Sequence, residues 1–80
     1  MSTDEAVRNR IQDLCEKHNI TPHKLAIEAG LPPSTLKSIM CGDSKNPKLL
    51  TIGIICDGLD ISLREFFDCE YFDEIDQIIQ

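Results

Sequence analysis

The stretch from Thr21 to Gly42, TPHKLAIEAGLPPSTLKSIMCG, constrains the fold most, because it holds start and stop signals for two short helices. Thr21 can cap a helix whose first position is Pro22, where proline's missing N–H would be unpaired anyway. Gly30 can take the left-handed conformation that ends this helix, and Pro33 can begin the next one. Apolar residues recur at helical spacing in both segments: Leu25, Ala26 and Ala29 in the first, and Leu36, Ile39 and Met40 in the second. The pattern therefore predicts two helices joined by a tight glycine turn, which is a helix-turn-helix motif.

Similar signals predict helices in the rest of the chain. Capping boxes that begin at Ser2 and Ser62 mark the starts of a first and a fifth helix, and the first should run to about His18. An apolar stretch from about Leu49 to Gly58 predicts a fourth helix. No alternating strand pattern is present, so the expected fold class is all-α.

The predicted fourth helix is so rich in apolar residues that we expect it to be mostly enclosed. Its apolar positions are Leu49, Ile52, Ile55, Cys56 and Leu59. Glycine inside a helix costs about 1 kcal/mol relative to alanine. We therefore expect Gly53 to lie where another helix packs closely against this one.

Two segments together resemble one known family. T-x-x-x-L-A-x-x-x-G-L-x-x-S-T-L-x-x-I-x-x-G, from Thr21 to Gly42, and N-P-x-L-x-T-I-x-x-I-C-D-x-L-x-I-S-L-R-E-F-F, from Asn46 to Phe67, are similar to the XRE family of phage-repressor and Cro type. The resemblance covers roughly Val7 to Asp68. It implies a five-helix, repressor-like domain that places its third helix in the major groove of double-stranded DNA. We expect this domain at residues 1–69, followed by an additional short C-terminal helix in an acidic amphipathic tail at residues 70–80.

The third helix should carry the residues that read bases. If its apolar residues are buried, the opposite side faces outward, and the resemblance implies that these outward positions meet base edges: Pro33, Ser34, Lys37, Ser38 and Cys41. Serine hydroxyls can hydrogen-bond many bases, and Lys37 could reach guanine or a phosphate. Family members often have a hydrogen-bonding side chain in place of Pro22 and Pro33, so these two positions lose polar readout, although Pro33 could touch a thymine methyl group.

Other residues are expected to contact phosphates. The start of the second helix, with its backbone N–H groups, favours an anion near His23 and Lys24. The resemblance implies a second phosphate clamp at the start of the fourth helix. The full predicted set is Thr21, His23, Lys24, Thr35, Lys45, Asn46 and Lys48. Arg8 and Arg10 on the first helix are expected in solvent instead.

The charge distribution leaves two functional classes open. The net charge of −6 argues against a nucleic-acid partner, but residues 1–48 hold seven basic and six acidic residues, a net of +1. Residues 49–80 hold Arg64 and eight acidic residues, a net of −7. The main hypothesis is a sequence-specific transcriptional regulator, a repressor of phage or mobile-element type that acts by occupying its operator. The alternative is a protein-interaction module on the same scaffold, antitoxin-like or antirepressor-like, which the acidity and the two prolines favour.

The tail predicts a homodimer. Its apolar residues recur at helical spacing and form the predicted dimer interface: Phe72, Ile75, Ile78 and Ile79. An apolar stripe of this size must cover either another chain or the chain's own core. Operators of this class are commonly paired half-sites about 34 Å apart, which favours pairing of two chains.

Several other functions find little support. The four cysteines are widely spaced without a C-x-x-C pair, so neither a disulfide framework nor a metal site is expected. The two histidines lack a nucleophile or carboxylate at a spacing that would assemble a catalytic site, so we expect neither an enzyme nor a small-molecule substrate or cofactor. The absence of a membrane-length apolar run and of a signal peptide predicts a soluble, cytoplasmic protein with no membrane partner.

Overall fold

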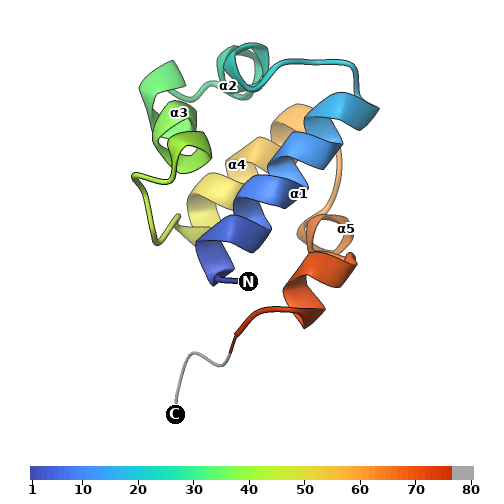
Figure 1. The fold of residues 1–80 in the computed structure, drawn as a ribbon. Helices are drawn as coiled ribbons and strands as arrows, with labels where there is room; N and C mark the ends of the chain where they lie inside the picture. Colours follow the sequence, from blue (N-terminus) through green and yellow to red (C-terminus); the bar gives the residue numbers. More distant parts are fainter. Residues whose placement is uncertain (77–80) are drawn as a thin grey trace.

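A computed structural model describes residues 1–76 of the 80-residue chain and shows the predicted all-α fold (Figure 1). Five α-helices are followed by one short 3₁₀ helix: α1 Thr3–Lys17, α2 Pro22–Ala29, α3 Pro33–Cys41, α4 Leu49–Leu59, α5 Leu63–Phe67 and η1 Glu70–Asp73. The helices α2 and α3 lie at one end of the molecule, whereas α5 and η1 lie at the other (Figure 1). No helix within the described residues is long and apolar enough to cross a membrane.

Local capping interactions explain where the helices begin and end. The side chains of Ser2, Thr21 and Ser62 each accept a hydrogen bond from a backbone N–H in the first turn of the following helix. Gly30 and Gly42 end α2 and α3 in the left-handed conformation, with φ of 79° and 82°. The predicted starts of α1, α2, α3 and α5 are therefore confirmed.

One buried cluster joins all five helices. Its residues are Val7, Ile11, Leu14, Cys15, Leu25, Ala26, Leu36, Ile39, Ile52, Ile55, Cys56, Leu59 and Phe66. Burial raises the pKa of the Cys15 and Cys56 thiols, as expected for cysteines that serve as small apolar residues. Phe66 closes the C-terminal end of the cluster. The centroid of its ring lies 5.1 Å from that of the Phe67 ring and 6.0 Å from that of the Phe72 ring.

The expected enclosure of α4 is confirmed at Ile52, Ile55, Cys56 and Leu59, which are buried, but the expectations for two single residues are wrong. Leu49 is 62% exposed rather than enclosed, because it lies in the first turn of α4, beyond the reach of the core. A Cβ atom added to Gly53 would meet no atom within 4 Å, so close packing does not explain this glycine. The close approach is at Gly58 instead, where an added Cβ atom would lie 2.8 Å from the Cβ atom of Ala29. Glycine at this position lets α2 pack directly on α4.

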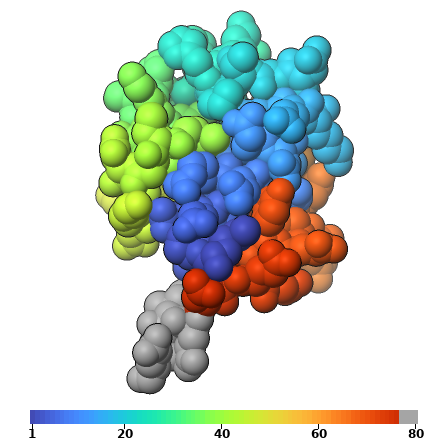
Figure 2. Space-filling model, viewed as in Figure 1, coloured from blue at the N-terminus to red at the C-terminus, as the bar shows by residue number. Residues whose placement is uncertain are grey.

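The C-terminal segment differs from the continuous helix that its periodicity predicts. Between residues 70 and 76, helical structure is limited to η1, and residues 74–76 are not helical. The Tyr71 hydroxyl donates a hydrogen bond to Asp13 of α1, and the Asp76 backbone N–H donates to the Met1 carbonyl oxygen at 2.8 Å. Figure 2 shows this segment lying against α1. These long-range contacts favour a segment folded back on its own domain over a regular helix.

Candidate nucleic-acid interface

The third helix presents its predicted reading residues on the outside. Leu36 and Ile39 are 1% and 3% exposed and attach α3 to the core. On the remaining surface, Pro33, Ser34, Lys37 and Cys41 are exposed, and Ser38 is half-buried. The structure thus brings the five predicted base-contacting positions together along α3.

A polar hollow of about 310 Å³ separates α3 from the start of α4. We call it the polar hollow; its lining consists of Thr35, Ser38, Ile39, Ser44, Asn46, Pro47, Lys48 and Thr51. Hydroxyl groups, an amide and an ammonium group converge there, and these groups bind phosphate oxygens in nucleic-acid complexes. The backbone N–H groups of Asp43 and Ser44 both donate to the Ser38 carbonyl oxygen, at 2.9 and 3.1 Å, and hold the α3–α4 loop beside α3.

The polar hollow includes two residues that the sequence analysis missed. Ser44 and Thr51 add hydroxyl groups to the predicted Thr35, Asn46 and Lys48. Thr51 lies in the first turn of α4, three positions after the N-cap residue Lys48, so its place in the helix was the available signal. Ser44 lies in a loop whose course depends on its hydrogen bonds to α3, and local sequence carries no such signal.

A second, mainly apolar hollow of about 450 Å³ lies on the other side of α3, between α3 and α2. We call it the apolar hollow; its lining consists of Pro22, His23, Pro33, Ser34, Leu36, Lys37 and Met40. Pro22 and Pro33 both occupy the first turns of their helices, and neither supplies a backbone N–H, because the ring of proline replaces that hydrogen. The outward side of α3 is therefore flanked by two hollows of opposite chemistry.

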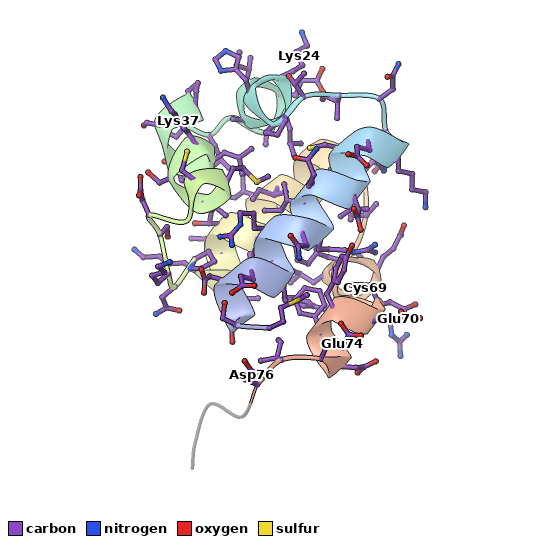
Figure 3. The ribbon with its side chains drawn as sticks, in the orientation of Figure 1. Lys24, Lys37, Cys69, Glu70, Glu74 and Asp76 are labelled. Carbon is purple, nitrogen blue, oxygen red and sulfur yellow. The ribbon has the colours of Figure 1, made fainter. Side chains whose placement is uncertain are left out.

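The charged residues divide between this surface and the tertiary structure. Lys24 and Lys37 project outward from α2 and α3, far from the acidic Glu70, Glu74 and Asp76 (Figure 3). Lys24 is exposed, whereas the Thr21 hydroxyl is engaged as the α2 cap and accepts from the Lys24 N–H at 3.1 Å. These positions fit the predicted role of the α2 start.

Lys45 is tied to α1. Its Nζ atom lies 3.7 Å from Oδ2 of Asp4, and the same carboxylate oxygen lies 3.5 Å from Nη1 of Arg8. The hydrogen bond from the Ser2 hydroxyl is the main cause of a lowered pKa at Asp4, to which Lys45 and Arg8 also contribute. The Lys45 side chain is 75% exposed, so it can leave this pair for a phosphate.

The two arginines of α1 are not simply solvated, contrary to expectation. Arg10 donates from Nε to the Phe66 carbonyl oxygen and from Nη2 to that of Glu65, both at 2.7 Å. These bonds satisfy carbonyl groups at the C-terminal end of α5, where a helix leaves acceptors unpaired. Arg8 is half-buried beside Asp4, with its Nη1 atom fully enclosed. The Arg10 side chain therefore serves the tertiary structure, whereas Arg8 pairs with a carboxylate of its own helix.

Of the four predicted dimer residues, the structure describes Phe72 and Ile75, which lie in the C-terminal segment and away from α3. The centroids of the Phe72 and Phe67 rings lie 4.8 Å apart, and both Phe72 and Ile75 are half-buried. Ile78 and Ile79 lie outside the described residues. The structure thus brings Phe72 and Ile75 together beside α5.

The geometry of α2 and α3 agrees with a comparison to known families. The sequence model of the Cro/C1-type helix-turn-helix DNA-binding domain matches residues 10–71. The chain belongs to this Cro/C1-type family. It is a family of non-enzymatic DNA-binding regulators, which agrees with the sequence analysis.

A solved structure agrees with this assignment. The chain is similar to the crystal structure of the prophage Lp1 protein 11, with 36% identity and a TM-score of 0.81. The similarity covers 94% of this Cro/C1-type chain and 100% of the prophage protein. No curated protein matches the sequence.

Proposed function

We propose that this Cro/C1-type protein is a sequence-specific transcriptional repressor of phage or mobile-element type, acting by occupancy of its operator. The main support is the continuity between the outward side of α3 and the polar hollow. Ser38 belongs to both, so a base edge read by α3 and a phosphate bound beside Lys48 would lie on one continuous surface. The similarity to a prophage protein favours the phage or mobile-element setting.

In this proposal the contacts divide by chemistry. Ser34, Lys37 and Ser38 read base edges, since hydroxyl and ammonium groups can hydrogen-bond to them in the major groove. Lys48 and the hydroxyls of the polar hollow hold one phosphate, and Lys24 with His23 approaches another at the start of α2. Phosphate contacts position the domain, while the base contacts supply sequence preference.

Selection of bound sequences from a random DNA pool, at two salt concentrations, tests the proposal. We expect one enriched motif that persists at the higher salt concentration, since base contacts discriminate between sequences at any given salt concentration. Ser38→Ala should change the preference at one base position while the rest of the motif remains. A pool without enrichment would reject sequence-specific binding and favour the protein-interaction alternative.

We further propose that the protein binds as a homodimer. A groove of about 490 Å³ lies between the start of α4 and the C-terminal segment. Its lining is mainly apolar, with Pro47, Leu49, Phe67, Phe72 and Ile75, and it also includes Lys45 and Asn46. Leu49 and the adjacent Leu50 are 62% and 74% exposed, which is unusual for two consecutive leucines on a monomer. Pairing through this groove would cover Leu49 and join two α3 helices for paired half-sites.

Light scattering at several protein concentrations tests the dimer. Ile75→Asp, and Ile79→Asp in the adjoining tail, should shift the protein to monomer because a carboxylate would have to be buried in the interface. Ile27→Asp is the matched control: Ile27 is 54% exposed on α2 and does not line the groove. A native chain that stays monomeric at high micromolar concentration would end the dimer hypothesis without affecting DNA recognition by one domain.

A further inference from the structure

The apolar hollow shares residues with the reading surface. Pro33, Ser34 and Lys37 lie on the outward side of α3 and also line the hollow. Leu36, which is 1% exposed, and the half-buried Met40 form the base of the hollow. A DNA duplex placed against α3 would therefore lie over this opening.

The lining is poor in hydrogen-bonding groups for a definite reason. Proline occupies the first turn of both α2 and α3, so a rigid ring stands where another residue would offer an N–H and a flexible side chain. The polar side chains are those of His23, Ser34 and Lys37. The polar hollow across α3 instead contains four hydroxyl groups, those of Thr35, Ser38, Ser44 and Thr51.

The chemistry of base edges identifies an occupant for this hollow. In the major groove, bases present hydrogen-bond donors and acceptors and a single apolar group, the C5-methyl of thymine. A donor or acceptor pressed against the proline rings would lose its water without gaining a partner. The methyl group alone gains by entering, because it leaves water for contact with Pro22, Pro33 and Met40.

We propose that the apolar hollow receives the 5-methyl group of a thymine and so determines a preference for thymine at one position of the operator. This inference rests on the proposed function, since it assigns one base contact of the same DNA surface. Pro22 and Pro33 are then specificity-determining residues rather than losses of polar readout. Lys37 at the rim is placed to contact a neighbouring phosphate or base.

Removal of single methyl groups from the selected operator tests the proposal. Each thymine of the enriched motif is replaced in turn by deoxyuridine, which keeps every hydrogen-bonding group and removes only the methyl. At one position we expect affinity to fall about fourfold, the effect of exposing one buried methyl group. Fluorescence anisotropy with the native protein measures each ratio of thymine to uracil affinity.

Two neighbouring prolines provide a matched pair of variants. Pro33 lines the hollow, whereas Pro32 is also exposed but does not line it. Pro33→Ala should bring the thymine-to-uracil ratio at the sensitive position close to one, and Pro32→Ala should leave it near four. Pro22 lines the hollow from α2, so Pro22→Ala should also reduce the thymine-to-uracil ratio. This second variant tests the proposal if circular dichroism shows that Pro33→Ala has lost helix content.

The outcomes separate the two proposals. A specific motif in which no thymine responds to methyl removal would overturn the methyl site while the proposed function stands. A methyl effect that neither Pro33→Ala nor Pro22→Ala reduces would place the methyl against other residues and also overturn it. Failure to enrich any motif would overturn the proposed function and the methyl site together.

Discussion

The two ends of the molecule use their polar side chains in opposite ways. At the C-terminal end, Tyr71 donates to Asp13, and Arg10 donates to the carbonyl groups of Phe66 and Glu65. On α3, the side chains of Ser34, Lys37 and Ser38 make no hydrogen bond or ion pair within residues 1–76. One end therefore commits its polar groups to tertiary structure, and the other leaves them for an external partner.

The charge distribution follows the same division. All eight acidic residues of the segment 49–80 come after the apolar first turns of α4, and the labelled Glu70, Glu74 and Asp76 lie far from Lys24 and Lys37 (Figure 3). Repulsion between the acidic end and DNA would be weak at this separation under physiological salt, because charges more than about 8 Å apart are largely screened. A net charge of −6 is thus compatible with a DNA-binding surface on the other end.

The largest expected effect concerns stability at the C-terminal end. Phe66→Ala should lower the free energy of unfolding by about 3–5 kcal/mol, because the ring is fully buried at the junction of α5 with the core. Ser34→Ala on the exposed side of α3 should change it by less than about 0.5 kcal/mol. Urea unfolding followed by circular dichroism measures both, and similar values for the two variants would contradict the division between the ends.

A glycine pair tests how α2, and with it the reading surface, is attached to α4. Gly58→Ala should destabilise by about 1–2 kcal/mol, because its new Cβ atom would lie 2.8 Å from the Cβ atom of Ala29 and force the helices apart. Gly53→Ala meets open space and should stabilise by about 0.5–1 kcal/mol through helix propensity. In thermal unfolding, the unfolding temperature should fall for Gly58→Ala and rise for Gly53→Ala. Changes of the same sign would mean that the close approach of α2 and α4 does not limit the size of the residue at position 58.

Removal of one positive charge from each end compares their roles in DNA binding. Lys48→Ala should weaken binding for all sequences and lower the slope of log affinity against log salt by about one unit, because one phosphate contact is lost. Arg64→Ala removes the same charge from the C-terminal end and should leave the slope unchanged. Salt titrations with the selected operator measure both slopes, and a similar change in both would show only a general charge effect.

The smallest expected effect is an alkaline pH dependence of the C-terminal segment. The hydrogen bond to Asp13 is the main cause of a raised pKa at Tyr71, so the folded value lies above the ordinary 10.0. This bond stabilises the packing of the C-terminal segment on α1 fully below pH 10. The stabilisation is lost as the pH rises through the raised pKa of Tyr71 in the folded protein. Tyr71 is the sole tyrosine of the chain, so an ultraviolet titration of tyrosinate reports its pKa directly.

Asp13→Asn provides the control for this titration. It removes the negative charge that holds the hydroxyl proton, so the pKa of Tyr71 should fall toward its ordinary value. The same pKa in both proteins would show that the bond does not persist in solution and that the segment is held by its other contacts, those of the Phe72 ring and of Asp76.

The sequence by itself determined where α1, α2, α3 and α5 begin and which side of α3 is buried. Caps act within one turn, so Ser2, Thr21 and Ser62 at the helix starts and Gly30 and Gly42 at the ends could be identified from neighbouring residues alone. Helical periodicity likewise identified the outward positions of α3, because the spacing of Leu36 and Ile39 fixes the opposite side. The place of Lys48 beside α3 could also be predicted, but through the family resemblance rather than from spacing.

Only the tertiary structure decided the features that join distant segments. The two hollows beside α3 combine residues from separate helices, the partner of Gly58 is 29 positions away at Ala29, and Arg10 caps a helix 55 positions further along the chain.

The C-terminal segment shows the same limit. Its apolar periodicity predicts a continuous helix, yet its Phe72 ring packs on Phe66 and Phe67 and its Tyr71 bonds to α1. Up to residue 76, its helical structure is the single 3₁₀ turn of η1. Helix propensity amounts to a few tenths of a kcal/mol per residue, so contacts with distant residues can override it in a short segment.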